Sequence, residues 1–146
     1  MRDIEFRAVS QLDGNWVYGS LIKYEYKRPN MEDLSKPQVQ TSYDICRKES
    51  DWCFSYKNVP VFEETIGQYT GLTDKKGRKI FEGDIVYDSY REYSYLVTYW
   101  LGQGMYFLDK INDRCGNWYS FEDVDFSENI EVIGNIHDNP ELLEEV

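Results

Sequence analysis

Aromatic residues are abundant in this chain, and alanine is almost absent from it. Trp, Tyr and Phe number 4, 13 and 7 among the 146 residues, whereas alanine occurs once, at Ala8. Helical bundles and coiled coils rely on Ala, Leu, Glu and Lys. The composition therefore excludes most helical architectures, while a chain of 17.4 kDa is long enough to bury a real core.

Apolar and polar residues alternate in many parts of the sequence. This alternation is the pattern expected of a β-strand with one buried face. Strands are predicted at Ile4–Ala8, Trp16–Ile22, 39–46, 52–56, 95–100, 105–108 and 130–136. Residues 28–38 read as a loop, and the strand over 95–100 is expected to be buried on both faces. Many short strands separated by turns predict a mainly β fold, an antiparallel sandwich or small barrel.

A single helix start is predicted near the C-terminal end. Asn139 suits the N-cap, Pro140 the first helical position and Glu141 the first turn. Few residues follow, so we expect a short C-terminal helix of at most two turns, held by packing. Gly134 stands in the preceding strand where a side chain is expected, which predicts a bulge or a close approach by another backbone.

The densest group of turn signals lies between residues 65 and 86. Asp74 and Gly77 suit the first and fourth positions of a type I turn. Gly83 and Asp84 form a second turn, in which Gly permits a positive φ and Asp accepts hydrogen bonds from turn amides. This arrangement is typical of small antiparallel barrels and indicates no catalysis.

Four stretches in the same order resemble the YopX family of phage and prophage proteins. They are Ile4–Ala8, Gln68–Leu72 with Asp74 and Gly77, Ile80–Val86, and Val132–Leu143. The family usually continues Arg-Ala with Trp-Asp, whereas Val9 and Ser10 follow here. The resemblance implies an SH3-like barrel with extra strands, a single domain over residues 1–146 and a phage or prophage origin. It carries over no activity, cofactor or functional residue.

The surplus of acidic residues is concentrated at one end of the chain. The formal net charge is -11, yet residues 120–146 contain nine acids and no Lys or Arg. Apolar residues are interleaved with these acids, which predicts a folded segment rather than a disordered tail. Two interpretations stay open: a solvated face that keeps the protein soluble, or a negative patch that docks a basic partner or imitates nucleic acid. Glu122, Asp123 and Asp125 are the candidates for such a patch.

Two further groups of residues are candidates for a binding surface. Tyr90, Arg91 and Tyr93 lie in a polar linker, and exposed Tyr beside Arg is typical of protein interfaces; the alternative is that they pack over the barrel end. A basic cluster also occupies the turn at residues 74–79. Its members are Lys75, Lys76, Arg78 and Lys79.

The sequence contains no residue pattern typical of catalysis, of a metal site or of a cofactor site. The sole histidine, His137, lies in a corner that suits a structural role better than a general base. Cys46, Cys53 and Cys115 lack the paired spacing of a zinc site. No segment approaches a membrane span. The N-terminus has no apolar signal region, which predicts a cytoplasmic location in a bacterial host cell.

We therefore expect an accessory protein that is not an enzyme, needs no cofactor and works as a protein-interaction module. It would associate with itself or dock a host or phage protein. The alternative is a role linked to nucleic acid, either direct binding through the basic turn 74–79 or mimicry through residues 120–146. The net charge of -11 weighs against direct binding, which depends on cations that release counterions from phosphates.

Overall fold

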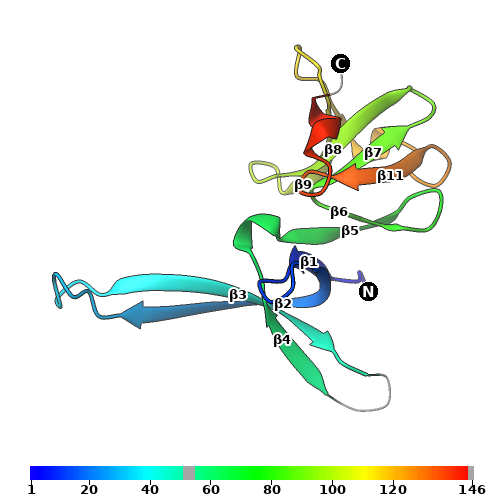
Figure 1. Ribbon diagram of the computed structural model, residues 1–146. Coiled ribbons are helices and arrows are strands. Elements are labelled where there is room, and N and C mark those ends of the chain that lie inside the picture. Colours follow the sequence, from blue (N-terminus) through cyan, green and yellow to red (C-terminus); the bar gives the residue numbers. More distant parts are fainter. Residues whose placement is uncertain (51–54, 145–146) are drawn as a thin grey trace. The chain divides into compact units, whose positions relative to one another are not determined.

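The computed structural model describes residues 1–50 and 55–144, and strands make up 52% of them. This part of the chain divides into two compact units, drawn as a ribbon in Figure 1. The arm unit comprises Glu5–Ile66, and the sheet unit combines Met1–Ile4 with the chain from Gly67 onward. The single domain expected over residues 1–146 stays a prediction.

The arm unit is built on four antiparallel strands in the order β4-β3-β2-β1. They are β1 (Phe6–Val9), β2 (Trp16–Arg28), β3 (Gln38–Lys48) and β4 (Tyr56–Pro60). Alternate residues of these strands and the chain beside them form a small apolar core of Ala8, Val17, Ile45, Val59 and Val61. A 3-10 turn, η1 (Glu63–Thr65), ends the unit, and the Thr65 hydroxyl accepts a hydrogen bond from the Val9 amide at 2.8 Å.

Strand β2 changes partner at Gly19. Before this residue it pairs with β1, and from Ser20 to Arg28 it pairs with β3. A Cβ atom at Gly19 would lie 2.2 Å from the carbonyl oxygen of Cys46, so only glycine fits this crossing. Beyond it, β2 and β3 continue as a two-stranded hairpin that extends away from the core of their own unit (Figure 1).

We call residues 23–42 of this hairpin the arm. The strand predicted over residues 39–46 is confirmed, but β2 continues six residues past the predicted end at Ile22. The predicted strand over 52–56 falls mainly on residues 51–54, which lie outside the described chain.

The sheet unit contains a β-hairpin and a five-stranded antiparallel sheet in the order β10-β9-β8-β7-β11. The hairpin joins β5 (Gly67–Thr73) to β6 (Lys79–Phe81). The sheet consists of β7 (Asp84–Asp88), β8 (Tyr93–Trp100), β9 (Met105–Lys110), β10 (Trp118–Ser120) and β11 (Ile130–Asn135). Its core contains Ile80, Val86, Tyr95, Val97, Leu108, Val124, Phe126 and Ile130.

The predictions made from local turn chemistry are confirmed. The Gly77 amide donates to the Asp74 carbonyl oxygen at 2.9 Å, which closes the first turn. Gly83 has a φ of 84°, and the Asp84 carboxylate accepts a hydrogen bond from the Phe81 amide at 2.8 Å. β11 has a bulge between Val132 and Gly134. The close approach at Gly134 comes from the Asn139 side chain, however, and not from a backbone.

The mainly β, antiparallel class is confirmed, but the described strands form open sheets and not a closed barrel. Strands β10 and β11 stand at opposite ends of the five-stranded order, and the segment between them packs Val124 and Phe126 on the core instead of pairing the two edges.

The expected C-terminal helix is only a 3-10 turn, η3 (Pro140–Leu143). The Asn139 side chain does not cap it, because its oxygen accepts from the Asn135 amide at 3.4 Å. The other helical segments in residues 1–50 and 55–144 are equally short, and none is long enough to cross a bilayer.

Candidate interaction surfaces

The turn between β7 and β8 is organised by Asp88, whose side chain is fully buried. One carboxylate oxygen accepts from the amides of Tyr90 and Arg91 at 2.9 and 3.2 Å, and the other accepts from the Arg91 guanidinium at 2.9 Å. This hydrogen bond to Asp88 raises the pKa of Arg91. The carboxylate therefore fixes the turn that carries the predicted tyrosines.

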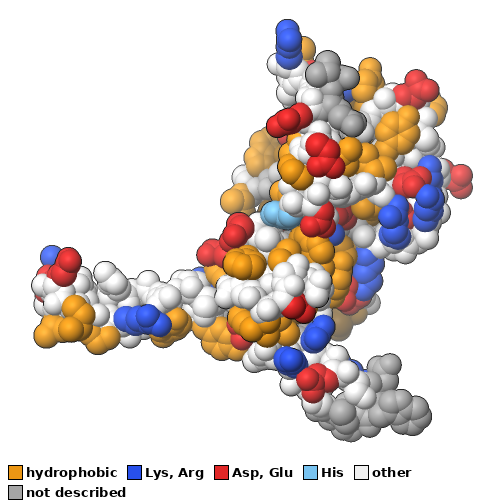
Figure 2. Space-filling model, viewed as in Figure 1, with side chains coloured by type: hydrophobic (Ala, Val, Ile, Leu, Met, Phe, Trp, Pro, Cys, Tyr) orange, Lys and Arg blue, Asp and Glu red, His pale blue; other side chains and the backbone are white. Residues whose placement is uncertain are grey.

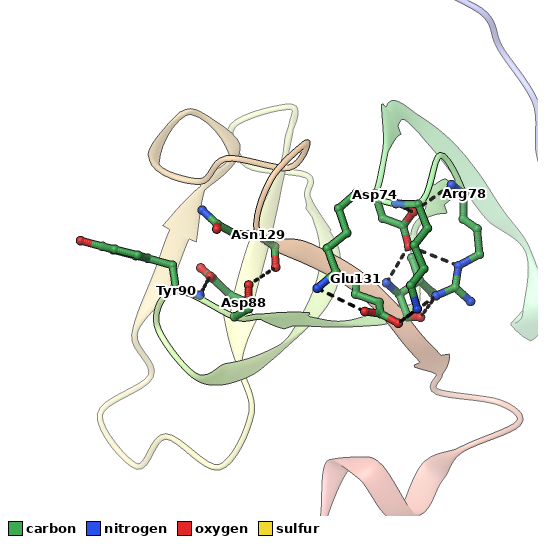
Figure 3. A network of polar contacts seen from close by, with 10 residues as sticks. Asp74, Arg78, Asp88, Tyr90, Asn129 and Glu131 are labelled. Carbon is green, nitrogen blue, oxygen red and sulfur yellow. Dashed lines mark hydrogen bonds and ion pairs between the residues drawn. The ribbon is translucent and has the colours of Figure 1, made fainter.

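The three predicted residues of this turn have different environments. Tyr90 is 78% exposed, and its ring points away from the neighbouring polar network (Figure 3). Arg91 lies over the Tyr119 ring and donates to the Asp123 carbonyl oxygen at 2.7 Å, so it joins this turn to the acidic segment. Tyr93 begins β8, and the Lys110 ammonium lies 3.3 Å from its ring centroid. Only Tyr90 is presented fully to solvent.

All four cations of the basic turn have acidic neighbours in the sheet unit. Lys75 and Lys76 form ion pairs with Glu131, Lys75 at 3.3 Å. Arg78 pairs with Asp74 at 3.2 Å and Lys79 with Asp3 at 3.5 Å. Hydrogen bonds from Lys76 and Lys75 lower the pKa of Glu131. Three carboxylates thus face the four cations, and that of Glu131 attaches the turn to β11.

Asp74 is the centre of this attachment, as Figure 3 shows with Arg78 and Glu131 beside it. Its side chain is inaccessible to solvent, and it accepts hydrogen bonds from the amides of Lys76 and Arg78 at 2.9 Å and of Val132 at 3.0 Å. Burial alone would raise the pKa of Asp74, but these amides and the Arg78 guanidinium outweigh it and leave the pKa below its ordinary value. The carboxylate therefore remains ionised and connects two segments 58 residues apart.

The three predicted acidic residues follow one another around the 3-10 turn η2 (Phe121–Asp123). The Asp123 carboxylate accepts from the Ser120 amide, which completes a capping box. Asp125 accepts from Ser127 and Glu128, and these bonds lower its pKa. No ion pair to the Glu122 carboxylate occurs in the described part of the chain. Glu122 is thus the carboxylate of this group that remains open to a partner.

Two adjoining cavities of the sheet unit share Phe121 and Glu122 in their walls. The first encloses about 370 Å³ and is lined also by Arg2, Tyr99 and Tyr106. The second, about 560 Å³, follows residues 121–127 beside Leu72. The wall of the first combines aromatic rings with both signs of charge, whereas the charged side chains of the second are all acidic. No pattern in the sequence pointed to the first cavity, because its lining residues come from segments far apart in the chain.

A second surface that sequence reasoning missed lies across β8, β9 and β10. We call Trp100, Leu101, Phe107 and Trp118 the aromatic surface. The rings of Trp100, Phe107 and Trp118 contact one another with centroids 5.6–6.2 Å apart, and Leu101 is 89% exposed. The prediction that residues 95–100 are buried on both faces is therefore wrong at Trp100. It is also wrong at Tyr99, which is 36% exposed, so that Tyr95 and Val97 are the buried residues of the strand.

The arm presents the third surface. Every residue in Lys23–Pro29 and in residues 34–41 is exposed, although nine consecutive residue pairs, Ser20–Cys46 to Arg28–Gln38, hold the hairpin together. Figure 2 shows hydrophobic side chains, in orange, along its surface. They include Tyr24, Tyr26, Met31, Leu34 and Val39. Alternation at Tyr24 and Tyr26 was the available signal for the longer strand, but the polar residues around it hid the pattern.

Groups with chemical reactivity are dispersed. No cluster of three or more metal-ligating side chains occurs in residues 1–50 and 55–144. Cys46 and Cys115 are free thiols, and Cys53 lies outside the described residues. The His137 amide donates to the Asn135 side chain at 2.9 Å, in the corner between β11 and η3. The sequence-based expectation of no enzymatic activity stays a prediction.

Comparison with known proteins gives a family and a likeness of fold. No curated protein matches the chain. A crystal structure of protein EF1440 from Enterococcus faecalis is similar over 98% of this chain and 99% of that one, with 22% identity and a TM-score of 0.50. A likeness at that identity concerns the fold alone. The family model described as YopX protein matches residues 5–144. That range is nearly the whole sequence, so the chain belongs to the YopX family.

Proposed function

We propose that this protein is a phage- or prophage-encoded accessory protein that acts as a non-catalytic interaction module and associates with itself. One observation carries the proposal: the arm exposes apolar side chains on a two-stranded ribbon. An isolated two-stranded hairpin is at best marginally stable in water. Met31 and Leu34 at its tip are 89% and 76% exposed, and Val39 on its strand is 61% exposed. Burial of such groups in an assembly would stabilise both the arm and the complex.

The test is the mass of the purified full-length chain over a wide concentration range, by sedimentation equilibrium. We expect a single 17.4 kDa species at the lowest concentrations and a dimer at the highest. The variant Trp118→Ser should dimerise like the wild type, because the proposal assigns self-association to the arm and not to the aromatic surface. A chain that stays at the monomer mass throughout would contradict the proposal.

The alternative role linked to nucleic acid divides into two cases. Direct binding through the turn 74–79 is less favoured, because its cations have Glu131, Asp74 and Asp3 as neighbours. Mimicry through residues 120–146 retains the open Glu122 carboxylate, but Asp123 and Asp125 are used to cap turns. We therefore rank both below self-association.

A further inference from the structure

The two long edges of the arm differ in how strongly their residues oppose pairing with a strand of another chain. Open strand edges invite pairing with other chains, and native proteins block them with charged residues, proline or bulges. The β2 edge carries Lys23, Glu25, Lys27 and Arg28 within six residues. The β3 edge over residues 38–42 reads Gln-Val-Gln-Thr-Ser, without a charge, proline, glycine or bulge. In the described chain β4 pairs with β3 only from Asp44 onward, so this edge is left open.

The backbone groups that face the open edge follow from the contacts of Tyr43. Its carbonyl oxygen accepts from the Val61 amide on this side of β3. In an antiparallel ladder the N–H and C=O of one residue point the same way, and the direction alternates along the strand. Val39 and Thr41 therefore present their N–H and C=O groups to the open edge. Gln38, Gln40 and Ser42 direct theirs to β2.

This edge is symmetric about Gln40, and its surroundings suit a second copy of the same chain. Val39 and Thr41 lie one residue to either side of Gln40, so a two-fold axis midway between two Gln40 residues brings Val39 of each copy opposite Thr41 of the other. Residues 20–46 contain four basic and four acidic side chains. By contrast, the sheet unit has 8 basic and 17 acidic residues in its sequence. The neutral hairpin is thus where two copies of a chain of net charge -11 meet with the least repulsion.

We propose that strand β3 of one copy pairs antiparallel with β3 of a second copy, with Gln40 opposite Gln40. Val39 of each copy then exchanges both of its open backbone hydrogen bonds with Thr41 of the other. The two arms become one four-stranded intermolecular sheet, in which Tyr26 and Gln40 of both copies share a face. This pairing rests on the proposed self-association and specifies its surface.

A proline at an outward-facing position tests the pairing without breaking the arm. The N–H of Thr41 points to the open edge and not to β2, so Thr41→Pro removes a donor used only between copies. We expect this variant to weaken the dimer at least about tenfold, since two interchain donors disappear per dimer. Thr41→Val keeps the amide and should retain the wild-type dissociation constant. Circular dichroism of each variant reports whether its strands are intact.

Cross-linking provides a readout that does not depend on the proline variant. Opposed residues in antiparallel strands have Cα atoms about 4.5–5.5 Å apart, which a disulfide spans. Mild oxidation of Gln40→Cys should therefore link two chains. Gln38→Cys lies on the same exposed face, but the two cysteines would be about 13 Å apart and should not link. Wild-type protein treated in parallel gives the background from the native cysteines.

The outcomes separate this inference from the proposed function. A dimer that withstands Thr41→Pro and does not link through Gln40→Cys would overturn the β3 pairing while leaving self-association in place. Selective cross-linking of Gln40→Cys, with a weaker Thr41→Pro dimer, would support it. A wild-type chain that is monomeric at every concentration would overturn both proposals. Efficient linking through Gln38→Cys instead would contradict the register.

Discussion

Tyr95 occupies the centre of the sheet unit's core, where its side chain is completely buried. Its ring meets that of Tyr119 edge-on, with centroids 5.6 Å apart. Its hydroxyl has no hydrogen-bond partner within residues 1–50 and 55–144. Burial raises the pKa of Tyr95 to about 12, so the group stays neutral. A buried hydroxyl without a partner destabilises the folded state.

Removal of this hydroxyl should therefore not weaken the protein. We expect Tyr95→Phe to keep or increase the free energy of unfolding, by up to about 1 kcal/mol, as measured by urea denaturation. Tyr90→Phe, on an exposed ring, is the matched control and should change it by less than about 0.5 kcal/mol. A loss above about 1 kcal/mol in Tyr95→Phe would mean that the hydroxyl has a partner after all.

Individual residues were predictable where the chemistry is local. Turn rules describe residues whose hydrogen bonds and backbone conformations involve only their close neighbours in the sequence. Such residues include Asp74, Gly77, Gly83 and Asp84. The same rules did not reveal that Asp74 also accepts from Val132, because no local pattern relates residues 58 apart. For the same reason the contacts of Arg91 with Tyr119 and Asp123, and the wall of the first cavity, were not predictable.

At the scale of elements, the β5–β6 hairpin is fixed to β11 through one ionised carboxylate. Asp74 receives three backbone amides and the Arg78 guanidinium, and its pKa is lowered in the folded state. When folding lowers the pKa of a carboxyl group, its ionised form stabilises the folded state. That stabilisation is complete at pH values above the pKa of the group in the unfolded chain, near 3.9 for Asp. That contribution is lost as the pH falls through the folded value.

Asp74→Asn should accordingly be less stable than the wild type by about 1–3 kcal/mol at pH 7, because a charged acceptor is replaced by a neutral one. Denaturant unfolding from pH 7 down to about pH 3 would measure the difference. We expect the gap to narrow below about pH 4, because the unfolded wild-type chain binds a proton at Asp74 there before the folded carboxylate does. A gap that is constant over this range would rule out the ionised carboxylate as its source.

Strand positions were predictable more often than strand lengths. The strands predicted over 95–100 and 105–108 occur as β8 and β9, and the strand predicted over 39–46 occurs as β3. The extension of β2 to Arg28 was not predictable, because both faces of the arm are exposed and apolar periodicity reports only burial. The C-terminal helix was expected from Asn139-Pro140-Glu141. It is replaced by η3 because the Asn139 side chain binds β11 instead.

For the whole molecule, the main feature is the uneven distribution of charge between the two units. The arm unit has 8 basic and 10 acidic residues, whereas the sheet unit has 8 and 17. The whole acidic excess of the sheet unit lies in residues 120–146, because the rest of that unit has 8 basic and 8 acidic residues. Phosphate backbones are bound through many available cations, and this unit offers few.

We expect no salt-sensitive binding of double-stranded DNA to the full chain. Fluorescence anisotropy with a labelled duplex, at about 50 and 200 mM salt, is the measurement. Binding that weakens steeply with salt and disappears in a Lys75→Gln/Lys76→Gln variant would revive direct recognition through the basic turn. Competition by the protein for a basic DNA-binding partner, abolished by Glu122→Gln, would instead favour mimicry.

The exposed arm has a consequence for how long each molecule lasts in a cell. If its β3 edge is covered only by a second copy, the order of the hairpin depends on how much protein has accumulated. Dilute, newly made chains would offer the residue 29–37 tip to proteases, which prefer exposed loop tips. Chains made when the protein is abundant enough to dimerise would be protected from this proteolysis. Abundance would then control turnover, so that a small rise in synthesis gives a disproportionate rise in the surviving protein.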